Sequence, residues 1–396
     1  MRPAWLDGLR RGGLIVTALL YSAGYGVWGL SLLLVAALAE AAVTRRLPWA
    51  RTRVDLFLAA FLAAFLISGI LSPYRPVATG SVGLAAVTIF LAFGSTAGVL
   101  KRDPSFLRPL VTAWVVGAVG AAVWGIVLRR MTGGAAFTPE LGRNALGTAL
   151  LIGTILSLGL VLERRGGPRY LAAVGVFILL AGLVLTYTRG AWLGALVGAV
   201  LLLGLAGVRK LVAGIAAAAL LVAVGLALVG SERAALISRA ASIPDLSANQ
   251  DRLLLIRTSL AIFAAYPVSG TGLNTFSLVY PAFRLPNDRN PLPLPFAHNI
   301  FVNMAAEGGI LGFATFLAIV LVGVYGGWRW HRARGPEQVT AATVLAAFVG
   351  AIVHQVFDGT LLSVHLGLGL WVLLAILGVG WTRAAEPVTD RRWTSA

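Results

Sequence analysis

The sequence contains no cysteine, and this absence excludes several kinds of chemistry. No disulfide can form, no thiol can serve as a nucleophile, and no metal site can use thiolate ligands. Histidine is scarce, with four residues in a chain of 396, and their spacing matches no metal-binding motif. A P-loop and a dinucleotide-binding glycine motif are also missing, so we expect neither a metal nor another bound cofactor.

Charged residues are few as well. They make up 12% of the chain, against roughly 25% in soluble domains. Hydrophobic residues make up 58%, the mean hydropathy is +0.87, and stretches of about 20 apolar residues recur, each long enough to cross a bilayer core. The sequence therefore predicts an all-α, polytopic integral membrane protein, because a soluble fold could not bury so much apolar surface.

Acidic residues are outnumbered, with 15 Asp and Glu against 32 Lys and Arg, and the net charge is +17. In a soluble protein such a charge would indicate a nucleic-acid partner. In a membrane protein, basic residues instead hold the spans in their orientation. We therefore expect membrane lipids as partners and no nucleic acid.

Ten apolar segments are clear candidates for membrane spans. They cover residues 54–72, 80–100, 108–128, 143–162, 170–187, 190–207, 211–230, 298–327, 339–358 and 361–382. Residues 14–43 are ambiguous, because Gly24, Gly26 and Gly29 allow either one long span or a hairpin of two short ones. The arginines before this stretch resemble those of a signal peptide, but we expect it to be retained.

The distribution of basic residues favours the hairpin. With two spans in residues 14–43 and a cytoplasmic N-terminus, most of the 32 basic residues fall in cytoplasmic loops, whereas a single span would reverse every later loop. The sequence then predicts about 12 spans with both termini cytoplasmic. Spans 1–8 would occupy residues 1–230, one long extracytoplasmic loop residues 231–297, spans 9–12 residues 298–382, and a cytoplasmic tail residues 383–396.

The long loop divides into three parts. Residues 247–267, "SANQDRLLLIRTSLAIFAAYP", carry apolar residues at helical spacing, which predicts a helix at the membrane surface. Gly270 and Gly272 then indicate a turn. Residues 280–296 are rich in proline, and we expect them to be extended and irregular.

Several arginines fall on the predicted outer side. Arg189 lies in a short connection between two spans, Arg252 and Arg257 lie in the surface helix, and Arg284 flanks the proline-rich segment. A planar guanidinium can donate two charge-assisted hydrogen bonds to neighbouring phosphate oxygens. Together these arginines would suit a pyrophosphate held at the membrane surface. The alternative is that they only reach lipid headgroups.

His298 and Asn299 stand just before an apolar helix that we expect to begin at Ile300. The exposed amides at a helix N-terminus disfavour positive charge. The imidazole should therefore be largely neutral near pH 7, as a general base requires. The alternative is that His298 is a capping or interfacial residue without a chemical role.

Two acidic residues are further candidates. Glu307 lies inside the predicted ninth span, where a carboxylate is costly and needs a partner or a role. Asp358 and His354 approach the outer end of the eleventh predicted span and could line the same cavity as His298. Ordinary helix-end polarity is the alternative for this second pair.

Three stretches resemble the O-antigen ligase and polymerase superfamily of bacterial membrane glycosyltransferases. They are "LTYTRGAWLGALVG" (residues 185–198), "DRLLLIRTSLAIFAAYPVSGTGLNTF" (residues 251–276) and "AHNIFVNMAAEGGILGF" (residues 297–313). Each motif alone is loose. Together they stand in the order found in the family, within a chain of about 12 predicted spans.

The resemblance implies transfer of a glycan from an undecaprenyl-pyrophosphate carrier to an acceptor hydroxyl, such as that of lipid A-core, outside the bacterial cytoplasmic membrane. It also implies that His298 is the family's essential histidine and that Arg189 and Arg252 are its two arginines. Arg284 would help to bind the donor pyrophosphate. The possible supporting residues are Asn299, Glu307, Asp358 and Arg257. The chain departs from the family in having Thr188 where serine is common, and Arg257 could replace Arg252 as the counterpart.

Other functions stay open at this point. A polymerase of the same superfamily would use the same donor and take a second carrier-linked glycan as its acceptor. A cell-wall polymerase of the related shape-and-division class would rely on an acidic loop residue, for which Asp245, Asp251 and Asp288 are available. A transporter of lipid-linked glycans would use the arginines only as a phosphate pathway, although transporters tend to place ionisable residues at mid-membrane.

Overall fold

The computed structural model describes residues 4–45, 49–207, 250–286, 296–333 and 335–386, together with positions 234, 237, 238, 241, 288 and 292. No strand occurs among these residues. The all-α class predicted from the sequence is therefore confirmed for this part of the chain.

The helices follow one another along the chain with mostly short connections. They are α1 (Ala4–Tyr21), α2 (Val27–Thr44), α3 (Asp55–Leu71), α4 (Arg75–Ile89), the π-helical turn η1 (Phe90–Gly94), α5 (Ser95–Arg102), the 3₁₀ turn η2 (Pro104–Phe106), α6 (Leu107–Thr132), α7 (Arg143–Glu163), α8 (Gly167–Leu185), α9 (Arg189–Ala206), α12 (Gln250–Ala265), α13 (Phe276–Phe283), α14 (Ile300–Arg332), α15 (Gln338–Gln355), the 3₁₀ turn η5 (Thr360–Leu362) and α16 (Val364–Ala384).

Nine segments of the described chain are long and apolar enough to cross a bilayer. They are α2, the continuous segment Arg75–Arg102 (α4, η1 and α5), the continuous segment Pro104–Thr132 (η2 and α6), α7, α8, α9, α14, α15 and α16. Helix α3 is apolar but has only 17 residues, and α1 carries three charged residues. The predicted span at residues 211–230 lies outside the described residues, so the count of 12 stays a prediction.

Residues 14–43 belong to two helices joined by a tight turn, as the hairpin interpretation requires. Helix α1 nevertheless begins at Ala4, well before the predicted span. Arg10 is buried and pairs with Glu40 of α2, with Nη2 and Oε2 2.9 Å apart. A buried arginine is tolerated when its charge is matched in this way, so the helix can continue through a charged segment.

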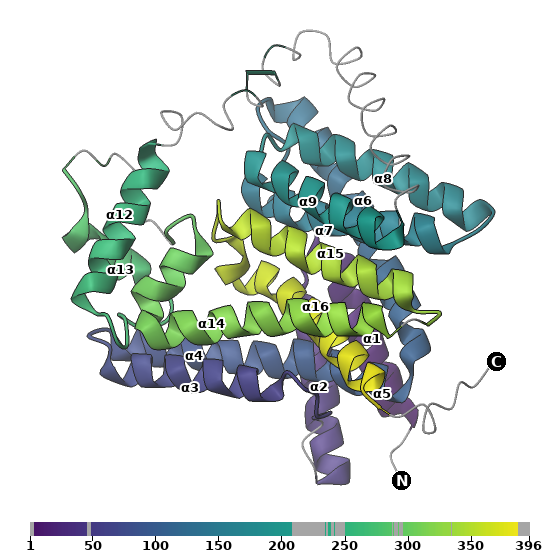
Figure 1. The fold of residues 1–396 in the computed structure, drawn as a ribbon, viewed down its shortest axis with the longest axis horizontal. Helices are drawn as coiled ribbons and strands as arrows, with labels where there is room; N and C mark the ends of the chain where they lie inside the picture. Colours follow the sequence, from purple (N-terminus) through teal and green to yellow (C-terminus); the bar gives the residue numbers. More distant parts are fainter. Residues whose placement is uncertain are drawn as a thin grey trace.

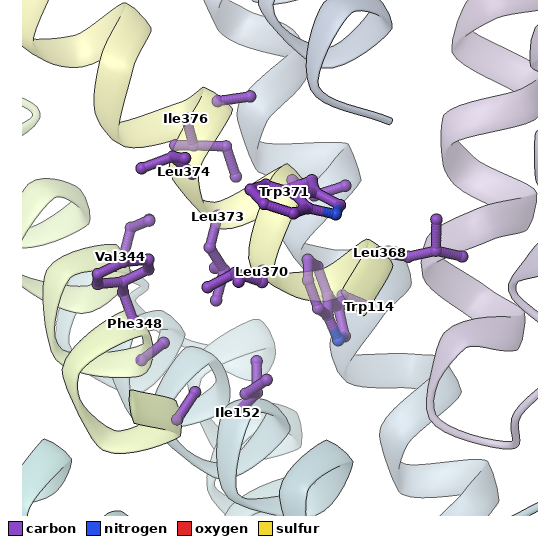
Figure 2. Close-up of a cluster of buried hydrophobic side chains, with 14 of the residues drawn as sticks. Trp114, Ile152, Val344, Phe348, Leu368, Leu370, Trp371, Leu373, Leu374 and Ile376 are labelled. Carbon is purple, nitrogen blue, oxygen red and sulfur yellow. The ribbon is translucent and has the colours of Figure 1, made fainter. Parts of the chain in front are cut away.

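Helix α16 is the centre of the apolar core. Every residue from Leu366 to Gly380 is buried. Figure 2 shows Trp114 of α6, Ile152 of α7 and Phe348 of α15 around the leucine side chains of α16. Because lipid tails are as apolar as these side chains, close packing is the main force that holds such helices together.

Helix α9 is held close to α15 by a row of glycines. Gly190, Gly194 and Gly198 recur every fourth residue, and therefore share one face of α9. A Cβ added at Gly194 would lie 2.5 Å from the carbonyl oxygen of Gly350, and one added at Gly198 would lie 2.9 Å from that of Ala346. This close approach fixes the start of α9 against the end of α15.

Replacement of Gly194 by alanine is expected to destabilise the fold. The new methyl group would meet backbone atoms of α15, and overpacking of this kind costs roughly 1–3 kcal/mol. Thermal unfolding of the purified protein in detergent measures the effect. Gly204 on the same helix is the matched control, because a Cβ there meets nothing within 4 Å. Equal stability of the G194A and G204A proteins would contradict the proposed packing.

Helices α12 and α13 form a small unit at one end of the molecule, where α14 begins (Figure 1). Leu255 and Ile262 of α12 pack with Phe276 and Tyr280 of α13 in a cluster separate from the main core. The helix predicted within residues 247–267 is thus present as α12. The expectation that residues 280–296 are extended is wrong for Tyr280–Phe283, because burial of Phe276 and Tyr280 outweighs the hydrogen bond lost at Pro281.

The turn predicted around Gly270 and Gly272 docks onto a break in α14. Gly309, with φ +58°, interrupts the helical backbone. The N–H of Gly272 donates to the carbonyl of Glu307 at 2.7 Å, and the N–H of Ile310 donates to the carbonyl of Pro267 at 2.8 Å. These backbone bonds join the motif around Gly270 to the motif around Gly309 and fix α12 and α13 against α14.

Candidate active site at the start of helix α14

Four segments that are far apart in the sequence line one cavity of about 260 Å³. The lining residues are Arg189, Gly190 and Leu193 of α9, Arg252, Leu253 and Ile256 of α12, His298 and Asn299 before α14, and Val356 and Phe357 after α15. The structure therefore brings Arg189, Arg252 and His298 together around one cavity.

Arg189 is the first residue of α9. The turn before it requires Tyr187 to adopt φ +53°, which is uncommon for a residue with a side chain. The N-cap Thr188 makes no side-chain hydrogen bond to the amides of α9. The N-terminus of α9 therefore adds its partial positive charge to that of the guanidinium at the cavity.

The two loop arginines of α12 differ in position. Arg252 lies in the first turn of α12 and is half-buried at the cavity, whereas Arg257 is exposed and is not among the cavity-lining residues. Arg284 follows the last residue of α13 and does not line the cavity either. Arg252 is therefore the loop arginine that the fold places beside Arg189 and His298.

His298 stands just before the N-cap of α14 with φ +52°. Asn299 is that N-cap, and its Oδ1 accepts hydrogen bonds from the amides of Phe301 and Val302 at 2.9 and 3.2 Å. The ring of Phe296 meets the imidazole edge-on, with centroids 5.0 Å apart. An unusual backbone conformation persists where its surroundings fix it, and here the contacts with Phe296 and Asp358 hold the imidazole.

Asp358 is the acidic partner of His298. Its Oδ1 lies 3.4 Å from Nδ1 of the imidazole, and its side chain is 1% exposed. Burial by itself raises the pKa of the Asp358 carboxyl, but the contacts with His298, His354 and the Gly359 amide outweigh it and hold the pKa below its usual range. The carboxylate is therefore charged at neutral pH.

Asn144 completes this arrangement from the first turn of α7. Its Nδ2 donates to the second carboxylate oxygen of Asp358 at 2.5 Å. Its own Oδ1 accepts from the hydroxyl of Thr188 at 3.3 Å. A chain of contacts thus runs from Thr188 through Asn144 and Asp358 to His298. Nothing in the sequence marks Asn144, because its helix is distant in the chain and carries no motif.

Asn299 takes up the first amides of α14, and the carboxylate of Asp358 lies beside the imidazole of His298. The neutral state expected for this histidine stays a prediction. The arrangement is an aspartate–histidine pair, which fixes the orientation of the ring and its tautomer.

Glu307 lies outside this cavity. It is 2% exposed, and its Oε1 accepts from the amide of Phe276, the first residue of α13, at 2.9 Å. A carboxylate at a helix N-terminus satisfies a free amide and matches the helix dipole. Glu307 therefore caps α13 and holds it to α14. The amide of Phe276 is the hydrogen-bond partner that a carboxylate inside a span needs.

A second cavity of about 290 Å³ adjoins the segment that carries His298. It is lined mostly by apolar side chains, including Phe61 of α3, Leu84 of α4, Ile300 of α14 and Trp371 of α16. Phe296 also lines it. In the described part of the chain, no group of three or more His, Asp or Glu side chains is placed to hold a metal ion.

Replacement of Asp358 by asparagine is expected to lower the turnover of any reaction in which His298 is the base. The amide has the same shape but neither fixes the tautomer nor stabilises the imidazolium, and loss of this partner in comparable pairs costs about 10⁴-fold. Single-turnover transfer by protein already loaded with donor measures the effect. A transfer rate equal to that of the wild-type protein would contradict the role assigned to the pair.

Comparison with known families adds a last observation. Residues 174–317 match the sequence model of the family described as O-antigen ligase. This stretch runs from within α8 to within α14 and includes Arg189, Arg252 and His298. No curated protein matches the chain. The match confirms the resemblance to the O-antigen ligase and polymerase superfamily that the three motifs indicate, over residues 174–317.

Proposed function

We propose that the protein is a membrane glycosyltransferase of the O-antigen ligase type. It would transfer a glycan from undecaprenyl pyrophosphate to an acceptor hydroxyl of the lipid A-core type. The match to the O-antigen ligase family over residues 174–317 supports a membrane glycan transferase in general terms. The observation that carries the specific proposal is the meeting of Arg189, Arg252 and His298 on one cavity.

The two arginines would bind the donor pyrophosphate. Each guanidinium can give two charge-assisted hydrogen bonds to phosphate oxygens, and the N-terminus of α9 favours an anion at the same place. As the bond between the anomeric carbon and the pyrophosphate oxygen breaks, negative charge grows on the leaving group. Arg189 and Arg252 would stabilise that charge, which lowers the barrier to transfer.

His298 would act as the general base. With Nδ1 directed to Asp358, Nε2 is the nitrogen left to accept a proton. The acceptor oxygen would form its bond to the anomeric carbon while its proton passes to Nε2 and undecaprenyl pyrophosphate leaves. A single displacement of this kind inverts the anomeric configuration. The activated pyrophosphate supplies the driving force, so the mechanism uses neither metal nor nucleotide.

The proposal includes a location and an orientation. We place the protein in the bacterial cytoplasmic membrane, with both termini in the cytoplasm and the cavity on the outer face. The distribution of basic residues supports this orientation. The apolar cavity beside Phe296 supports a lipid-linked substrate, and we assign it to the first part of the polyprenyl chain.

An assay with purified protein and carrier-linked oligosaccharide tests the proposal. With lipid A-core present, we expect one product in which the glycan is joined to the core. A ladder of longer carrier-linked glycans formed without core would instead indicate the polymerase reaction of the same superfamily. If the donor is bound but neither product forms, the protein is not a transferase and the transport alternative is favoured.

A further inference from the structure

A second arginine-containing cavity lies at the opposite end of α14 from His298. The last turns of α14 and the end of α16 enclose about 460 Å³, and the lining includes Tyr325, Trp328, Arg329, Arg332 and Trp381. The lining on α14 begins at Tyr325, 25 residues after the start of the helix at Ile300, and the two cavities share no lining residue. The cavity is therefore not part of that site.

The arginines of this cavity stand against aromatic rings. The guanidinium of Arg329 lies over the ring of Tyr325 and donates to its hydroxyl at 3.2 Å. That of Arg332 lies 5.1 Å from the centre of the Trp328 ring. Among the described residues, no carboxylate pairs with either arginine. The positive charge of Arg329 and Arg332 in the cavity is therefore not neutralised by the carboxylates of the described residues.

The charged residues next to this cavity do not neutralise the positive charge of Arg329 and Arg332. Glu337, which lies just before α15, is bound by Arg383 at 3.1 Å and by the indole of Trp330 at 3.2 Å. Arg53 adds another cation, with its guanidinium 5.5 Å from the centre of the Trp381 ring. A singly or doubly negative ligand group would be favoured at this position.

Along one face of α14, the side chains change from apolar to basic toward this cavity. Leu321, Tyr325, Trp328 and Arg332 follow one another at spacings of four, three and four residues, so they share one side of the helix. Leu321 is 59% exposed, Tyr325 48% and Trp328 41%. The order is apolar, then aromatic, then basic, which is the order of the hydrocarbon, interface and headgroup layers of a bilayer.

We propose that this cavity binds the headgroup of an anionic phospholipid, with the phosphodiester at Arg329 and Arg332. An acyl chain would extend along Leu321 toward the middle of the bilayer. The arginine forks match phosphate oxygens, and basic pockets between membrane helices are established binding places for anionic headgroups. The choice of a lipid over a soluble phosphate rests on the exposed apolar and aromatic face beside the arginines.

Binding of phosphatidylglycerol and phosphatidylcholine to delipidated protein, counted by native mass spectrometry, tests the proposal. The wild-type protein should prefer phosphatidylglycerol by roughly tenfold, since each arginine near the headgroup contributes to the attraction. The R329Q/R332Q protein should lose this preference, and the R329K/R332K protein should keep most of it. The R165Q/R169Q protein is the matched control, because it removes two exposed arginines outside the cavity.

Three outcomes would overturn the proposal. The first is an unchanged preference in R329Q/R332Q, and the second is an equal loss in R165Q/R169Q, which would indicate only a general effect of charge. Glycerol phosphate in excess should not displace the bound lipid, and displacement would point to a soluble phosphate ligand instead. Retention of the wild-type elution volume by each variant confirms that the comparison is made on folded protein.

Discussion

The H298A protein is expected to lose nearly all glycan transfer while it still binds the donor. A positioned general base contributes about 10²–10⁴-fold to rate, and alanine removes the only imidazole among the residues that line this cavity. The donor pyrophosphate would be held by Arg189 and Arg252, so its affinity should change little. Single-turnover transfer and equilibrium donor binding, measured on the same preparation, separate the two effects.

The H298Q protein controls for changes in shape. Glutamine keeps a polar side chain of moderate size but cannot accept a proton at neutral pH. It should therefore fail in transfer as H298A does. Wild-type transfer rates in either protein would show that His298 is not the base, whereas loss of donor binding in both would assign it to the binding of the donor.

The R252A protein is expected to bind the donor roughly 10- to 100-fold more weakly, which corresponds to the loss of a hydrogen-bonded charge on a phosphate. R189A should weaken donor binding in the same way. Arg257 provides the matched control, because it lies on the same helix as Arg252 but is exposed and does not line the cavity. The R257A protein should therefore bind the donor as the wild-type protein does.

Lysine at position 252 refines this comparison. It keeps the charge but cannot reproduce the planar fork, so R252K should be intermediate between wild type and R252A. If R257A weakened donor binding as strongly as R252A, long-range attraction by the whole loop would replace the proposed direct contact. If R252A bound the donor normally, the cavity would not be the pyrophosphate site.

The sequence predicted which residues line the candidate site better than it predicted the contacts between them. Arg189 and His298 lie in motifs that are read locally, one in a tight connection and one before a helix. The choice between Arg252 and Arg257 could not be made from the sequence, because both lie on α12. Only the packing of Leu255 and Ile262 against α13 and α14 decides which arginine meets the cavity.

Other features depended on contacts between distant parts of the chain. Asn144 and Asp358 lie on opposite sides of the long loop in the sequence, and only the packing of α7 against α15 brings them together. Glu307 was a candidate for chemistry because carboxylates are rare in spans. Its cap on α13 could not be foreseen, since Pro281 argued against a helix there. The early start of α1 likewise depends on the pairing of Arg10 with Glu40.

The most direct test of the account is an experimental structure of the protein with undecaprenyl pyrophosphate bound. We expect the diphosphate between Arg189 and Arg252, with its oxygens within about 3 Å of the guanidinium nitrogens and the imidazole of His298 facing the same space. A diphosphate bound elsewhere, for example in the arginine cavity at the far end of α14, would contradict the account.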